Sequence, residues 1–239
     1  MENKKENTEV DSKPSNKPKR IDGHYLSHEI QHLLHFEKGF LFTARELLLR
    51  PGKAVREFIF DDRNKYVKPI IFLIFSSVIY TAITHFTHIK ISFFNVDQVQ
   101  FNEVLKKEIR TKEIGNWTDS HLGYTNLIMG VFIGLWTKVF FKNYNYNLFE
   151  IIVLLCFVLG EAILIIGLFL LTAKLFTSSI IQTIGIWVYF IYITWAIGQF
   201  FGEKKIMNYV KSVLTYVLGN ISYLTTLVTV AYFFKKFVN

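Results

Sequence analysis

Five long apolar stretches constrain what this chain of 239 residues can fold into. Each has about 20 or more largely apolar residues, the length that an α-helix needs to cross a hydrocarbon core ~30 Å thick. They cover residues 69–88, 122–141, 151–173, 180–201 and 213–234. A soluble helical protein would need a polar face at helical period in each stretch, and these stretches mostly lack one. The sequence therefore predicts an all-α integral membrane helical bundle with five transmembrane helices.

The composition divides the chain into three parts. Residues 1–23 are polar and hold too few apolar side chains to offset the entropy of ordering, so we expect a disordered tail. Residues 24–68, which we name the juxtamembrane module, have the spacing of short amphipathic helices and are expected at the cytoplasmic surface of the membrane. The transmembrane bundle is residues 69–239, and its one long loop, residues 89–121, is expected on the external side.

Helix signals also appear within the juxtamembrane module. Thr43 with Glu46 three residues later has the pattern of a capping box before an apolar run. Pro51 and Gly52 then predict the end of that helix.

The distribution of basic residues predicts the orientation. One side of the predicted membrane carries Arg50, Lys53, Arg56, Arg63, Lys65, Lys68, Lys138, Lys142, Lys204, Lys205 and Lys211. The other side carries Lys90, Lys174, Lys235 and Lys236 close to the spans. Because Lys and Arg accumulate on the cytoplasmic side, we expect a multi-pass protein of the cell membrane with a cytoplasmic N-terminus and an external C-terminus. If one span does not insert, the C-terminus returns to the cytoplasm.

The net charge of +8 belongs to segments beside the apolar stretches rather than to a polar domain. This placement favours membrane lipids as partners and argues against nucleic acid. The candidate lipid-binding or partner-binding residues are Arg50, Pro51, Gly52, Lys53, Arg56, Arg63, Lys65 and Lys68. Each cation near an anionic leaflet contributes ~1 kcal/mol of attraction. The alternative is that these charges only set the topology.

Glu161 is the candidate functional residue inside the membrane. It lies 10 residues after Ile151, roughly 15 Å into its span at 1.5 Å per residue and thus near the midplane. The same count places several polar side chains at comparable depth, namely Tyr80, Thr81, Tyr189, Tyr192, Asn220 and Tyr223. An ionisable group at this depth either forms a proton or solute site or holds helices together as a protonated carboxyl.

Two further patterns bear on packing and metal binding. Gly130 and Gly134 form a GxxxG motif in the second span, which is typical of close helix–helix contact. His28-Glu29-Ile30-Gln31-His32 matches the H-E-x-x-H pattern of zinc peptidases, which makes His28 and His32 candidate metal ligands. A catalytic zinc needs a third protein ligand, and His35 lies about 10 Å from His28 along the same helix, too far to share one ion. We therefore expect no metal, cofactor or catalytic residue.

Residues 24–70 resemble an uncharacterised bacterial family of membrane proteins, the domain-of-unknown-function family thirty-six sixty-seven. The resemblance is carried by Gly39, Phe40, Leu41, Thr43, Glu46, Leu47, Arg50, Pro51, Gly52, Lys53, Arg56, Glu57, Arg63, Tyr66, Lys68 and Pro69. It implies an integral membrane protein of unassigned activity. Many relatives have an N-terminal cysteine pair like a zinc ribbon, whereas the one cysteine of this chain is Cys156.

These features favour a non-enzymatic accessory or scaffold protein that binds anionic lipid, a protein partner or a second copy of itself through its juxtamembrane module. The alternative is a small-solute or proton-coupled transporter that uses Glu161. A membrane-associated zinc peptidase using His28 and His32 is a minor alternative.

Overall fold

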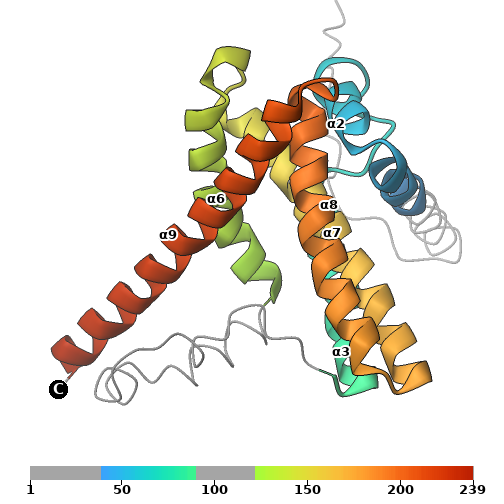
Figure 1. The fold of residues 1–239 in the computed structure, drawn as a ribbon, viewed down its shortest axis with the longest axis vertical. Coiled ribbons are helices and arrows are strands. Elements are labelled where there is room, and N and C mark those ends of the chain that lie inside the picture. The colour runs from blue at the N-terminus through green and yellow to red at the C-terminus, as the bar shows by residue number, and fades with distance from the viewer. Residues whose placement is uncertain (1–38, 90–121, 239) are drawn as a thin grey trace, which may run out of the picture. The chain divides into compact units, whose positions relative to one another are not determined.

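The computed structural model describes residues 39–89 and 122–238, and all regular structure in these two ranges is helical (Figure 1). This confirms the predicted all-α fold for the described residues. The elements are a helix described over residues 39–49, α2 (Pro51–Phe60), α3 (Pro69–Thr87), α6 (Leu122–Phe140), the short 3₁₀ turn η2 (Lys142–Tyr144), α7 (Leu148–Phe176), α8 (Ser179–Gly202) and α9 (Ile206–Val238). The predicted tail and the predicted external loop lie outside the described residues.

Four helices of the described ranges are long and apolar enough to cross a membrane, judged by length and composition. They are α3, α7, α8 and the part of α9 that covers Ile206–Val230. The remaining predicted span corresponds to α6, whose apolar part over Thr125–Phe140 is shorter. Over its described ranges the chain is thus all-helical, and its helices have the composition of a multi-pass membrane protein.

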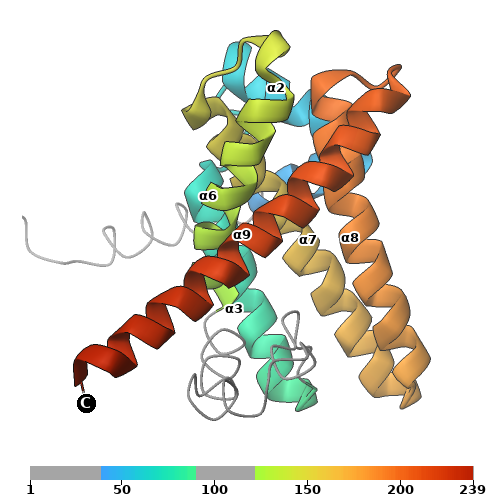
Figure 2. The same ribbon diagram turned by 60° about the vertical axis from the view of Figure 1, so that its left-hand side comes forward.

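Helix α7 lies at the centre of the bundle and is the most buried of the four. Helices α3, α6 and α8 pack on α7, while α9 packs on α6 and α8 (Figures 1 and 2). The predicted GxxxG contact is confirmed, because a Cβ on Gly130 would lie 3.2 Å from Leu159 and one on Gly134 would lie 3.3 Å from Leu155. Small residues on α6 therefore let it approach α7 closely.

Helix α7 is longer than the predicted span of residues 151–173. Its first turn is fixed by a capping box in which Asn147 Oδ1 accepts from the backbone N–H of Glu150 at 2.9 Å. In return, Glu150 Oε2 accepts from the N–H of Asn147 at 2.7 Å. Helix α9 likewise begins at Ile206 rather than at residue 213. The hydropathy pattern located the apolar middle of each helix, while the polar cap at Asn147 determines where α7 begins.

The predicted capping box at Thr43 and Glu46 is wrong. Both residues lie inside the helix that is described from residue 39, and the Thr43 hydroxyl donates to the carbonyl of Gly39 at 2.8 Å. Glu46 instead forms an ion pair with Arg50. As predicted, the helix ends before Pro51, which is the first residue of α2.

Candidate functional site

The described part of the juxtamembrane module, residues 39–68, joins the bundle where the beginning of α2 meets the end of α8. A Cβ on Gly52 would lie 2.6 Å from the carbonyl carbon of Gln199 and 2.6 Å from the backbone nitrogen of Phe200. Glycine at this position therefore lets the backbones of the two helices approach closely. The N–H of Gly52 donates to the side-chain Oε1 of Gln199 at 2.7 Å, so a side chain of α8 caps the first turn of α2.

Two side chains complete the other end of the same junction. The last four carbonyl groups of an α-helix have no partner within the helix, and in α8 they belong to residues 199–202. The guanidinium of Arg56 donates to the carbonyls of residues 199 and 200 at 2.9 and 2.7 Å. The side-chain amide of Asn208 donates to the carbonyls of residues 201 and 202, both at 3.0 Å. Arg56 also places a positive charge at the negative end of the α8 dipole.

A network of charged side chains covers the outer side of this junction. Arg50 forms ion pairs with Glu46 and Glu57, and Lys65 Nζ lies 3.2 Å from Glu57 Oε2. The Tyr66 hydroxyl donates to the same oxygen at 2.5 Å. This hydrogen bond, with the nearby Lys65 and Arg50, lowers the pKa of Glu57, while burial and the bond to Glu57 raise the pKa of Tyr66.

One contact within the module and two contacts with the bundle hold the helix of residues 39–49 in place. The Thr43 hydroxyl accepts from the N–H of Val67 at 3.0 Å, and the Tyr192 hydroxyl of α8 donates to the carbonyl of Leu47 at 3.0 Å. The ring of Phe40 lies 5.0 Å from that of Phe72 in α3, centroid to centroid. The module is thus tied to α3 and α8 by buried contacts.

The structure separates the eight candidate lipid-binding residues into two groups. Pro51, Gly52 and Arg56 form the junction with α8, and Arg50 and Lys65 bind the carboxylates beside it. The remaining cations, Lys53, Arg63 and Lys68, are exposed, as is Lys65. Lys53 lies 4.0 Å from Glu57 with 60% of its side chain exposed, and Arg63 reaches only the carbonyl of Ile59 at 3.4 Å. The motif therefore combines a structural joint with a smaller exposed basic group.

Glu161 is buried in α7, with 4% of its surface exposed. Its Oε2 has no hydrogen-bond partner, and Tyr192 lies near enough to interact with it electrostatically. A Cβ on the neighbouring Gly160 would lie 3.2 Å from the Cα of Leu73. Leu73 lies only about 6 Å from the first residue of α3, at 1.5 Å per residue. Glu161 therefore lies beside the beginning of α3 rather than beside its middle, because the first turns of α7 extend beyond the first residue of α3.

Of the polar side chains that were predicted at the depth of Glu161, Tyr192 lies near it. In a second group, the Tyr189 hydroxyl bonds to that of Tyr216 and interacts electrostatically with Tyr80. The side chain of Asn220 bonds to Tyr216 and extends this second group onto α9. Thr81 donates to the carbonyl of Ser77 at 2.8 Å, and the ring of Tyr223 packs on that of Phe132. The structure thus does not bring the predicted set together around the carboxylate.

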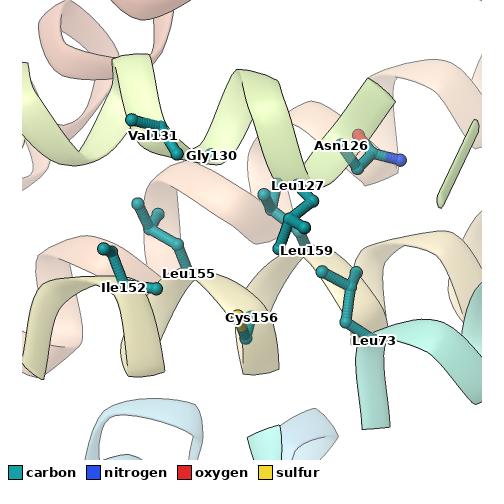
Figure 3. Close-up of a pocket in the computed structure, with 9 residues that line it drawn as sticks. All are labelled: Leu73, Asn126, Leu127, Gly130, Val131, Ile152, Leu155, Cys156 and Leu159. Atoms are coloured by element: carbon teal, nitrogen blue, oxygen red, sulfur yellow. The ribbon is translucent and has the colours of Figure 1, made fainter. Parts of the chain in front are cut away.

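A cavity of about 20 Å³ lies between α6 and α7, where Figure 3 shows mostly aliphatic side chains facing one another. It is lined by Leu73, Asn126, Leu127, Gly130, Val131, Ile152, Leu155, Cys156 and Leu159. The Nδ2 of Asn126 has no hydrogen-bond partner there. The volume suits a single water molecule, and Glu161 is not part of the lining.

The two histidines that were weak metal candidates, His28 and His32, lie outside the described residues. Within the described ranges no group of three or more His, Cys, Asp or Glu side chains could hold a metal ion. Sequence reasoning missed Gln199 and Asn208, which complete the junction. The sequence feature that could have identified them is a polar side chain on each side of the α8–α9 turn, because the ends of helices need hydrogen-bond partners.

The helices and the junction define an all-helical protein with helices of membrane-spanning composition, with a short N-terminal module fastened to its central helices. A family model described as "Protein of unknown function (DUF3667)" matches residues 37–81. This confirms the resemblance found in the sequence, and the matched region covers the described part of the juxtamembrane module and about two thirds of α3. No curated protein and no solved structure matches the chain.

Replacing Arg56 with Met should destabilise the protein, because two carbonyls at the end of α8 lose their donors. A hydrogen bond to a charged group contributes about 1.5–3 kcal/mol, so we expect a lower melting temperature of the protein in detergent, measured by intrinsic fluorescence. The matched control is Lys53→Met on the same helix, whose side chain is exposed. Equal melting temperatures for the two variants would contradict the capping role.

Acidification should weaken the network around Glu57. Because the folded-state pKa of Glu57 is below its ordinary value of 4.5, its contribution to stability is complete above that value. The contribution is lost as the pH falls through the lower folded-state pKa. We expect the melting temperature of the wild type to fall more between about pH 6 and about pH 3 than that of Glu57→Gln. Parallel curves for the two proteins would show that Glu57 contributes no pH-dependent stability.

Proposed function

We propose that this chain is a non-enzymatic accessory or scaffold protein of the bacterial inner membrane. Its N-terminus is cytoplasmic, and its juxtamembrane module binds anionic lipid at the inner leaflet. A protein partner or a second copy of the chain is a further expected ligand of this surface, and neither nucleic acid nor a cofactor is expected.

The observation that carries the proposal is the position of the exposed cations. The module lies at the end of the bundle where α8 ends and α9 begins (Figures 1 and 2), and its residues Lys53, Arg63 and Lys68 are exposed. Lys65 of the module is exposed as well, and the exposed lysines of the bundle at this end are Lys138, Lys142, Lys204 and Lys205. Such an accumulation is typical of the cytoplasmic end of a membrane protein and of binding to anionic headgroups.

The packing of α6 supports five spans rather than four. Lys211, near the start of α9, donates to the carbonyl of Phe140 at 3.2 Å, so α6 ends at the same end of the bundle as α8. Helix α3 begins at this end, after residue 68, and runs away from it (Figure 1). A chain that leaves through α3 and returns through α6 crosses the bilayer twice. With α9 as the last span, the C-terminus is external.

A second candidate function, proton-coupled transport, is favoured by one observation. The buried Oε2 of Glu161 has no hydrogen-bond partner, and no cation of the described residues pairs with this carboxyl. An ionisable group in such a position is by default a functional candidate. The Tyr192 hydroxyl could exchange its bond to the Leu47 carbonyl for one to the carboxyl.

Replacing Glu161 with Gln separates the two functions. The measurement is proton flux into proteoliposomes that contain a pH-sensitive dye. If Glu161 is a proton site, a pH gradient should drive proton flux through the wild type and none through Glu161→Gln, and the two proteins should have similar melting temperatures. The accessory function predicts no such flux in either protein. The control is Glu150→Gln, which changes an acid at the beginning of α7.

Removing the exposed cations should weaken lipid binding. The triple variant Lys53→Gln, Arg63→Gln, Lys68→Gln should lose about fivefold in preference for phosphatidylglycerol over phosphatidylcholine per cation, from ~1 kcal/mol each. The preference is measured by lipid retention after purification from mixed vesicles, and high salt should reduce it in the wild type. The control, Lys174→Gln, changes an exposed cation at the far end of α7. A triple variant that retains the wild-type preference would contradict the proposal.

A further inference from the structure

The helix of residues 39–49 carries large apolar side chains on two opposite faces. Phe40 and Leu47 are buried against the bundle, with 6% and 1% of their surfaces exposed. Leu41, Leu48 and Leu49 are 68%, 50% and 60% exposed. A surface helix of a soluble protein has a polar outer face, whereas a helix that is apolar all round is typical of an apolar environment.

The exposed leucines form one continuous surface. Leu41, Arg45, Leu48 and Leu49 follow the spacing i, i+4, i+7, i+8, which places them on the same side of an α-helix. Arg45 is exposed at the centre of this surface. The surface, which we name the outer leucine face, therefore combines apolar side chains with a single cation.

Contacts of the buried face establish how deep the helix lies. The ring of Phe40 lies 5.0 Å from Phe72 and 5.3 Å from Phe75, centroid to centroid. These residues follow Pro69 by three and six positions, or about 4.5 and 9 Å along α3. The beginning of the helix is therefore level with the first two turns of a predicted span. That part of α3 also exposes Ile70, Ile71, Ile74 and Phe75, so both helices expose apolar side chains at the level of the Phe40 contacts.

We infer that the helix of residues 39–49 is inserted into the cytoplasmic leaflet, with the outer leucine face on lipid acyl chains and the Arg45 guanidinium on a lipid phosphate. The inference rests on the proposed membrane function and adds a site to it. The occupant is lipid because the beginning of α3, a predicted span, exposes apolar side chains at the same level. The aliphatic part of an arginine side chain is long enough to reach from the first turns of a span to the headgroups. Its guanidinium can then form bidentate hydrogen bonds with a phosphate.

Spin labels test the environment of the outer leucine face in the full chain. Leu48→Cys and Leu49→Cys are made in a Cys156→Ala background and labelled in nanodiscs of phosphatidylglycerol and phosphatidylcholine. Collisions with oxygen, which concentrates in lipid, are compared with collisions with a water-soluble nickel chelate. Ile74→Cys is the reference for lipid exposure, and Asp62→Cys, in the exposed loop after α2, is the reference for water.

We expect both labels to collide more with oxygen than with the nickel chelate, as at position 74. Labels that behave as at position 62 would show that the face lies in water and would overturn the inference. Labels that neither reagent reaches would show that protein covers the face, whether a second copy, a partner or another segment of this chain, and would also overturn it. Positions 48 and 49 are exposed, so neither substitution removes a buried contact.

The role of Arg45 has its own measurement. Arg45→Gln should reduce the preference for spin-labelled phosphatidylglycerol over phosphatidylcholine, while Lys174→Gln should not. If Arg45→Gln keeps the wild-type preference, Arg45 does not bind a lipid phosphate. The inference and the proposed function can fail separately, because lipid retention by Lys53, Arg63 and Lys68 is measured without reference to the depth of the helix.

Discussion

The structure depends on the reciprocal capping of α2 and α8. The first turn of α2 receives its cap from Gln199, and the last turn of α8 receives its caps from Arg56 and Asn208. Gly52 makes the approach of the two backbones possible. Unsatisfied carbonyls are costly near a bilayer, where few water molecules replace a lost partner. The junction therefore makes the module part of the bundle rather than an appendage beside it.

The junction gives the basic Pro-Gly segment, which lies in the region matched by the family model, a structural role. The basic Pro-Gly segment contains Arg56, which serves the end of α8, and Arg50, which serves two carboxylates. Such a segment has the features of a structural joint, and Lys53, Arg63 and Lys68 are exposed cations beside it. The family match of residues 37–81 thus includes Gly52 and Arg56 of the joint and most of α3.

The sequence predicted the class of fold and most of its helices, because apolar blocks of membrane-spanning length allow few alternatives. It located α7 and α9 but placed their first residues too late. For α7 the reason is that hydropathy does not detect the cap at Asn147. It chose Thr43 as a cap, although Thr43 lies within a helix and binds its own backbone. The role of Arg56 could not be predicted, because the carbonyls that it binds lie more than 140 positions away on α8.

The most direct test of the account is hydrogen–deuterium exchange of the full chain in nanodiscs, measured by mass spectrometry over α2. The account predicts that amides of α2 are protected as strongly as those of the last turns of α8. It also predicts that Gln199→Ala accelerates exchange in both segments, because the junction opens as a unit. Rapid exchange of α2 in the wild type, with α8 still protected, would contradict the claim that the two helices cap each other.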